Sequence, residues 1–307
     1  MTTFWSMWIT VLSLACWASV TALLVFVLRL RPHLEEDGTT GHVYDGIREF
    51  DKPMPRWWLI FFWMTIVFAL GYFLAYPGLG NFPGLLKIQR LDGSVVNWTS
   101  ANEMQNDFDR NNAKFLASYD QNFAKKTVLE LSEDPRALKV GQRLFLQNCA
   151  VCHGSQAKGA KGFPNLTDND WLYGGTPDKI LETIHKGRQG GMPAWQEKLG
   201  EDGVKATAEY VLSLSGQANL NAAWVAEGEK LYKANCVACH GADGKGNQAI
   251  GSANLTDNIW LYGGDRATIR QTLRFGRAGQ MPAWEQQLGE QRINLLAAYV
   301  YSLSPHQ

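Results

Sequence analysis

The sequence has 307 residues, and 29 basic side chains balance 29 acidic ones, so the formal net charge is zero. This balance argues against a nucleic-acid-binding protein, which usually carries a basic stripe. A mean hydropathy of −0.21 excludes a mostly intramembrane chain, and a hydrophobic share of 46% excludes wholesale disorder. The length alone suggests about two domains.

Two windows, residues 1–28 and 57–86, contain no charged side chain. Within them, Phe4–Leu28 and Trp57–Tyr76 each reach the ~20 apolar residues that cross a bilayer. Long uncharged runs are rare in soluble cores, which disfavours a pair of buried helices. A cleaved signal peptide needs a basic start and a shorter apolar core. We therefore predict transmembrane helices in segments 1–30 and 57–80.

Basic side chains between the two spans set the expected orientation. The segment between them carries Arg29, Arg31, Arg48, Lys52 and Arg56, while the N-terminal tail has no Lys or Arg. The positive-inside rule places loop 31–56 in the cytoplasm. Both chain termini then lie on the periplasmic side.

A polar linker, residues 81–133, follows the second span. Ser100-x-x-Glu103 matches a capping box, which predicts that a helix starts here. The amphipathic pattern extends this helix to about Leu129.

The rest of the chain is an internal repeat with copies at 134–217 and 218–307. Each copy holds a Cys-x-x-Cys-His motif, then Asn-Leu-Thr-Asp-Asn-x-Trp-Leu-Tyr-Gly-Gly, then Met-Pro-Ala-Trp, and ends on Tyr-Val-x-Ser-Leu-Ser. The offset between copies is 87 residues at the cysteines and 89 afterwards, because the second copy has a two-residue insertion.

The cysteine motifs are those of covalent haem c attachment. Two thiols would form thioethers with the haem vinyl groups, and the adjacent histidine would ligate the iron; the residues are Cys149, Cys152, His153, Cys236, Cys239 and His240. A four-cysteine zinc site, a thioredoxin-like pair and structural disulfides are the alternatives. None of them explains the repeated histidine and the repeated Met-Pro-Ala-Trp segments.

The sixth iron ligands are predicted to be Met192 and Met281, each followed by proline. Met/His ligation raises the reduction potential and leaves no open coordination site. Ligation within each copy is the simpler arrangement and is slightly favoured. An exchange of the two methionine loops between copies remains the alternative.

Further repeated residues are candidates for the haem pockets. Trp171, Trp260, Arg188 and Arg277 are expected to bond propionates, or else to serve in packing and at the surface. The carbonyl before each Asn-Leu-Thr segment, on Pro164 and Ala253, is expected to orient the histidine through its other ring nitrogen.

Each copy is expected to begin and end with a helix: Pro135–Asn148, Gly203–Ser213, Ala222–Asn235 and Gln291–Ser302. Four aromatic side chains suggest a contact where the terminal helices cross: Phe145, Tyr210, Tyr232 and Tyr299. The layout is all-α. A copy of this size has little core of its own, so the haem is expected to be integral to folding.

The chain resembles the dihaem cytochrome c subunit (subunit III) of cbb(3)-type cytochrome c oxidases. The resemblance covers nearly the whole length: two N-terminal spans, the loop from His42 to Trp58, and two C-terminal haem domains. It implies two covalent haem c groups in tandem class I cytochrome c domains, anchored in a bacterial inner membrane and in contact with its lipid.

The resemblance also implies a role. Electrons would arrive from a periplasmic or membrane cytochrome c and leave through a monohaem subunit to the haem-copper catalytic subunit. The chain would be part of an enzyme without holding its oxygen-reducing centre. A subunit of another periplasmic reductase or dehydrogenase, a dihaem peroxidase and a haem-based gas sensor are the alternatives.

Overall fold

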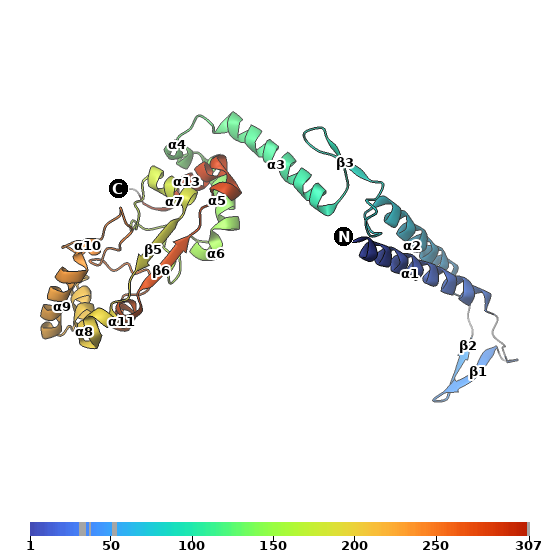
Figure 1. Cartoon of the computed structure of the whole chain (residues 1–307), viewed down its shortest axis with the longest axis horizontal. Helices are drawn as coiled ribbons and strands as arrows, with labels where there is room; N and C mark the ends of the chain where they lie inside the picture. The colour runs from blue at the N-terminus through green and yellow to red at the C-terminus, as the bar shows by residue number, and fades with distance from the viewer. Residues whose placement is uncertain (31–34, 37, 51–53, 306–307) are drawn as a thin grey trace. The chain divides into compact units, whose positions relative to one another are not determined.

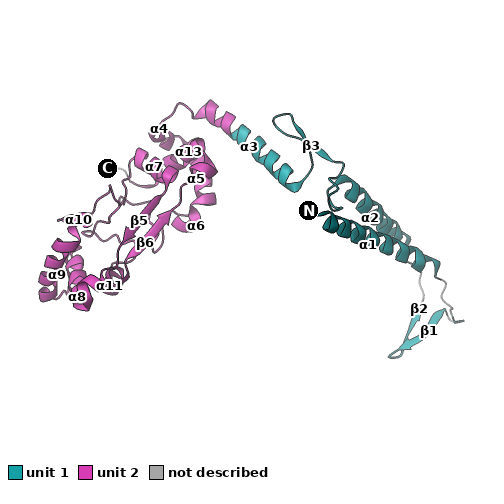
Figure 2. Cartoon of the chain, viewed as in Figure 1, with its two compact units in different colours: residues 1–115 teal, residues 116–307 magenta. Residues whose placement is uncertain are grey.

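A computed structural model describes residues 1–30, 35–36, 38–50 and 54–305. The chain divides into two compact units, Met1–Phe115 and Leu116–Gln307 (Figure 2). The described residues are mostly helical, with three short two-stranded antiparallel sheets. The expected all-α class is therefore confirmed only as mostly helical.

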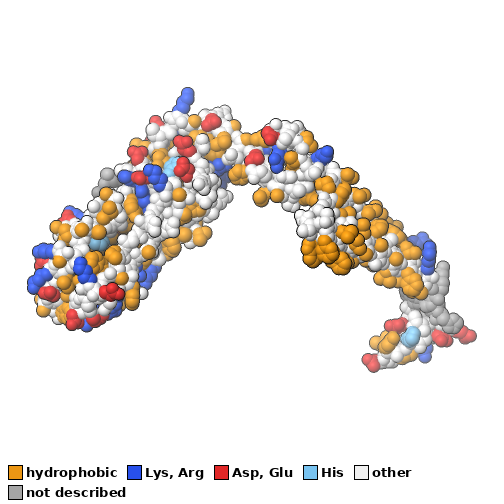
Figure 3. Space-filling view, in the orientation of Figure 1, with side chains coloured by type: hydrophobic (Ala, Val, Ile, Leu, Met, Phe, Trp, Pro, Cys, Tyr) orange, Lys and Arg blue, Asp and Glu red, His pale blue; other side chains and the backbone are white. Residues whose placement is uncertain are grey.

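The first unit contains two apolar helices, α1 (Thr3–Arg29) and α2 (Arg56–Ala75). Both are long and apolar enough to be membrane spans, and most of their side chains are exposed. Hydrophobic side chains cover their visible face in Figure 3. The Trp17 indole donates to the Ile66 carbonyl (3.0 Å) and so joins the two helices. Both agree with the predicted spans to within a residue at each end.

Short hairpins flank these helices. Strands β1 (Thr39–Tyr44) and β2 (Ile47–Phe50) pair in the loop between the spans, and β3 (Lys87–Gln89) pairs with β4 (Val95–Asn97) in the linker. Residues 31–34, 37 and 51–53 of the predicted loop 31–56 lie outside the described residues.

The linker helix, α3, runs from Ser100 to Asn122 and is shorter than predicted. Its first turn is capped by Thr99, whose hydroxyl accepts from the Asn102 N–H (3.0 Å), so Ser100 is not the cap. The prediction to Leu129 was wrong because Thr127 and Glu130 form a new capping box there. That box starts the separate helix α4 (Val128–Ser132).

In the second unit the helices form two groups, with strands β5 (Arg188–Met192) and β6 (Arg277–Met281) running side by side between them (Figure 1). One group contains α4, α5 (Pro135–Asn148), α7 (Pro177–Lys186), α12 (Glu285–Leu288) and α13 (Glu290–Leu303). The other contains α8 (Gln196–Leu214), α9 (Ala222–Asn235) and α11 (Arg266–Phe275). Each group therefore draws helices from both copies of the repeat.

Aromatic contacts show that the terminal helices of one copy pack on those of the other. Phe145 of the first copy contacts Tyr299 of the second, with ring centroids 5.6 Å apart. Tyr210 of the first copy contacts Tyr232 of the second at 5.2 Å. The expected aromatic contacts therefore form, but between copies and not within them.

Glycines make both crossings possible. A Cβ on Gly141 in α5 would lie 2.6 Å from the Cβ of Tyr299, and one on Gly228 in α9 would lie 2.8 Å from the Cβ of Tyr210. The backbones approach so closely that only glycine fits at these two positions. A glycine therefore allows the close approach of α5 to α13 and of α9 to α8.

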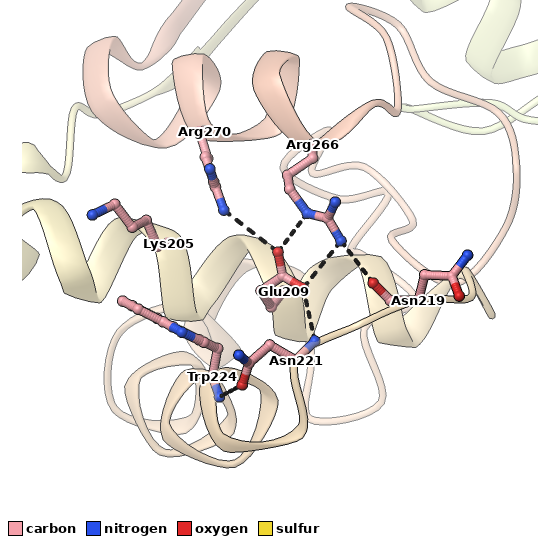
Figure 4. A pocket seen from close by; sticks show the side chains of 7 residues that line it. All are labelled: Lys205, Glu209, Asn219, Asn221, Trp224, Arg266 and Arg270. Carbon is pink, nitrogen blue, oxygen red and sulfur yellow. Dashed lines mark hydrogen bonds and ion pairs between the residues drawn. The ribbon is translucent and has the colours of Figure 1, made fainter.

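An ion-pair cluster fastens α8 to α11 (Figure 4). Glu209 is only 4% exposed, and it accepts from Arg266 Nε (2.5 Å) and from the backbone N–H of Asn221 (3.3 Å). Arg270 lies 3.5 Å from the same carboxylate. The cluster lines a surface hollow, and none of the hollow's lining residues belongs to the haem motifs.

Candidate haem sites

Each Cys-x-x-Cys-His motif forms one tight helical turn directly after a longer helix. The first turn is α6 (Ala150–His153) after α5, and the second is α10 (Val237–His240) after α9. In both turns the second cysteine, Cys152 or Cys239, is exposed. Burial raises the pKa of the first cysteine, Cys149 or Cys236, to about 11.

The two histidines are oriented as the sequence predicts. His153 Nδ1 lies 3.0 Å from the Pro164 carbonyl oxygen, and His240 Nδ1 lies 2.9 Å from that of Ala253. A carbonyl oxygen only accepts, so Nδ1 carries the proton in each ring. In a neutral ring with this tautomer, Nε2 is the nitrogen whose lone pair can ligate a metal.

Met281 ends strand β6 and lies beside elements of the first copy. Its partner in the strand register is Arg188. A Cβ on Gly187, at the end of α7, would overlap the backbone of Met281 and Pro282. Shortly after Met281, the Trp284 N–H donates to the Ile184 carbonyl of α7 (3.0 Å). This methionine loop therefore joins the helix group that holds His153.

Met192 has the reciprocal position at the end of β5. Its register partner is Arg277, and the Trp195 N–H donates to the Leu273 carbonyl of α11 (2.8 Å). Its side chain packs on the apolar core formed by α8 and α11, together with Trp260. The contacts of both methionine loops thus favour the exchanged arrangement over ligation within each copy.

The two arginines predicted to bond haem propionates, Arg188 and Arg277, have similar surroundings but different ion-pair partners. Arg188 donates to Thr183 (3.0 Å), and Arg277 donates in the same way to Thr272 (2.9 Å). Each guanidinium lies over a tyrosine ring of its own copy. Arg188 also pairs with Glu182 (3.2 Å). Arg277 Nη2 is buried and without a hydrogen-bond partner among the described residues, so it can receive an anionic ligand group.

The two candidate tryptophans pack against glycines at the end of the repeated loop. A Cβ on Gly175 would lie 2.5 Å from the Trp171 indole nitrogen, and one on Gly264 would lie equally close to that of Trp260. The Trp171 carbonyl accepts from Gln248 of the other copy (3.1 Å). Both indoles are half-buried at matching positions.

A half-buried carboxyl group, that of Asp170, lies within the first of these loops. Burial, with the nearby charges of Asp257 and Asp168, raises the pKa of Asp170 from its usual 3.8 to about 6. The equivalent position in the second copy is Ile259. The first-copy loop therefore carries an acid that the second lacks.

The arrangement fits two haem groups. The observations are a histidine with a free Nε2 after each cysteine pair, a methionine strand in each helix group, and the unpartnered Arg277 nitrogen. Sequence reasoning missed the β5–β6 ribbon and the Glu209 cluster. The alternating Arg-x-Gly-x-Met pattern before each proline was the one available signal for the strands.

Comparison with known families gives a consistent result. Residues 36–83 match the N-terminal domain of cytochrome oxidase-cbb3, FixP, and residues 136–211 and 223–300 match cytochrome c oxidase, cbb3-type, subunit III. The subunit CcoP of Rubrivivax gelatinosus is 43% identical over 98% of this chain and 95% of its own length. The chain belongs to the cbb3-type subunit III family.

Two further relatives extend this similarity. The subunit FixP of Bradyrhizobium diazoefficiens is 42% identical over 86% of this chain and 94% of its own length. The subunit CcoP of Cereibacter sphaeroides is 41% identical over 87% of this chain and 95% of its own. Family membership confirms the resemblance seen in the sequence. The chain is an electron-transfer subunit of a cbb3-type cytochrome c oxidase, an oxidoreductase complex, and its cytochrome c domains imply haem c.

Proposed function

We propose that this subunit carries two covalent haem c groups, each held by residues from both copies. The first is anchored by Cys149 and Cys152 and ligated by His153 and Met281. The second is anchored by Cys236 and Cys239 and ligated by His240 and Met192. When bound, each iron supplies a one-electron ferric/ferrous couple.

The observation that carries this proposal is the reciprocal placement of the two methionine strands. Strand β5 follows α7 of the first copy and leads to α11 of the second, whereas β6 follows α11 and leads to α7. Two histidines with an unprotonated Nε2 complete the donor sets. A methionine sulfur and an imidazole on each iron would leave no open coordination site for oxygen or peroxide.

The chain's own residues then have distinct tasks. The cysteines hold each group in a fixed position, and Pro164 and Ala253 keep the imidazoles in the ligating tautomer. Arg188 and Arg277, with Trp171 and Trp260, are the candidate donors to propionates. Pre-organised ligands keep the nuclear rearrangement of one-electron transfer small.

We place the two spans in the bacterial inner membrane, with loop 31–56 in the cytoplasm and both haem domains in the periplasm. The basic loop supports this orientation. The proposed donor is a periplasmic or membrane cytochrome c. The proposed acceptors are the monohaem subunit and, through it, the haem-copper catalytic subunit of the oxidase.

The ligand assignment is tested by NMR on the reduced full-length chain with labelled methionine methyl groups. Met192→Leu and Met281→Leu variants assign the two ligating methyl signals, which haem ring currents shift strongly. We expect the Met281 methyl to show contacts with the haem attached at Cys149 and Cys152. Contacts with the other haem would contradict ligation of each haem by residues from both copies. A count of one covalent haem per chain would contradict the proposal of two haem groups.

A further inference from the structure

We propose that the haem-attachment face of the first copy is the docking surface for a mobile electron carrier whose redox group is ringed by acidic side chains. This inference rests on the proposed function and adds the entry point and the chemistry of the partner. It follows from a comparison of the two haem-attachment faces, in which the same backbone hydrogen bonds fix the loop at both ends.

The loop after each motif folds back on its histidine in the same way. The Gly159 N–H donates to the His153 carbonyl (2.8 Å), and the Gly246 N–H donates to the His240 carbonyl (2.9 Å). Together with the bonds to Pro164 and Ala253, they place the same positions beside both turns. The second loop is two residues longer between these bonded positions, and at the other positions the two faces differ in their side chains.

The first face is apolar at its centre. Val151, between the two cysteines, is 90% exposed, and Leu146 and Phe163 are each more than 40% exposed. The equivalent positions in the second copy hold Ala238, Lys233 and Ser252. In the second copy, Cys239 is likewise exposed, but the one large apolar side chain exposed on the described residues of its motif and folded-back loop is Ile250 (53%), which lies in the longer loop and not at an equivalent position. Exposed apolar groups around a functional atom mark an interaction site.

Positive charge predominates in the segment that carries this apolar centre. Residues 135–163 contain five Lys and Arg and no Asp or Glu, whereas residues 222–252 contain three of each. Lys139 and Arg143 lie with Leu146 along the face of α5 opposite the buried residues Ala137 and Phe145. Lys158 and Lys161 are exposed on the folded-back loop.

Most of these charges are uncompensated; the exception is Arg136, which pairs with Asp134 (3.4 Å). Arg143, Lys158 and Lys161 form no ion pair within the described part of the chain. In the second copy, Lys230 pairs with Glu227 (3.0 Å) and Lys233 with Glu229 (2.6 Å). An uncompensated basic rim attracts an acidic partner over a Debye length, and a small apolar centre gives close but short-lived contact. This combination fits a mobile carrier.

The test uses the purified oxidase in detergent and measures binding, not turnover. The probe is a soluble, oxidised c-type cytochrome of negative net charge, and its dissociation constant is measured by surface plasmon resonance at low and high salt. The first variant, R143E/K158E, reverses two rim charges. The control, K230E/K245E, reverses the equivalent positions of the second copy.

We expect R143E/K158E to weaken binding about tenfold at low salt and to flatten its salt dependence, while the control changes it less than about twofold. V151S should weaken binding at both salt concentrations, and A238S should not. Equal losses in both charge variants would overturn the proposal. So would undiminished binding of the same cytochrome with amidated carboxylates, or release of the chain from the oxidase by R143E/K158E, which would indicate a fixed subunit contact.

Haem content per chain is measured separately in every variant. A wild-type chain without two covalent haems would overturn the proposed function. Unequal binding by two variants that both keep their haems tests the docking face alone.

Discussion

The two copies of the repeat have nearly the same elements, but they differ at the positions that join them. Glu209, Arg266 and Arg270 form the buried cluster between α8 and α11. Their equivalents on α13 and α7 are Ala298, Pro177 and Leu181. If α8 packed on α7 of its own copy, Glu209 would face Pro177 and Leu181 and lose both ion-pair partners, which is costly for a buried carboxylate. Residues that both copies have in common form the candidate haem sites. Residues that only one copy has determine which helices pack together.

The largest expected effect comes from closing a helix crossing. Gly141→Ala places a methyl group against the backbone of α13, so we expect a loss of about 3 kcal/mol of unfolding free energy. Denaturant unfolding of the haem-loaded chain measures it. Gly191→Ala is the control, since its Cβ would meet nothing closer than 3.9 Å. Equal stability of the two variants would contradict the α5–α13 crossing.

Removal of the buried Glu209 carboxylate tests the ion-pair cluster between α8 and α11. Glu209→Ala leaves two partly exposed arginines beside each other, so we expect a loss of about 2 kcal/mol, below the range for fully buried pairs. Denaturant unfolding measures the loss. The control is Glu201→Ala, which removes an exposed partner of Arg274 on the same two helices and should cost under about 1 kcal/mol. Equal costs would mean that Glu209 has no special role.

A double-mutant cycle distinguishes packing of the terminal helices between copies from packing within each copy. We expect a coupling energy of about 1 kcal/mol between Phe145→Leu and Tyr299→Leu, because the rings touch. The pair Phe145→Leu and Tyr210→Leu should show none. Coupling in the second pair and not in the first would mean that each copy packs on itself.

These crossings show how far sequence reasoning reaches. The repeat identified Phe145, Tyr210, Tyr232 and Tyr299 as contact residues, because aromatic side chains at repeated helix positions must be buried somewhere. It did not identify the pairs, since both pairings bury the same side chains. The helices α5 and α9 were predicted with the observed bounds, because the side chain of Asp134 or Asn221 caps the first turn and a cysteine turn follows the last.

The acid found only in the first copy predicts a dependence on pH. The folded state holds the proton of Asp170 up to about pH 6, whereas an ordinary carboxyl releases it near 3.8. Between these values the folded state binds more protons, so stability falls as pH rises through this window and stays lower above it. Asp170→Asn should remove this decline in a series of unfolding experiments. Asp202→Asn, at an exposed site, should leave it unchanged.

The smallest expected effect concerns the two arginines. Hydrogen bonds from Arg188 and Lys179 lower the pKa of Glu182 to about 2, so this residue is charged at neutral pH, while the second copy has Gln271. We expect Glu182→Gln to raise the reduction potential of the haem at Cys149, because a nearby negative charge is lost. Gln271→Glu should lower that of the other haem. Redox titration of the two haems checks both, and shifts of the opposite sign would contradict the placement of these arginines.

The sequence by itself determined the two apolar spans, the haem motifs, the histidine-orienting carbonyls and the family. These depend on local spacing and composition, which the chain carries without reference to its folded partners. Only the tertiary structure decided which copy each terminal helix and each methionine strand joins. Two similar copies offer two nearly equivalent packings, and the choice depends on a few unrepeated side chains, such as Glu209 and Arg266, that meet only in the folded unit.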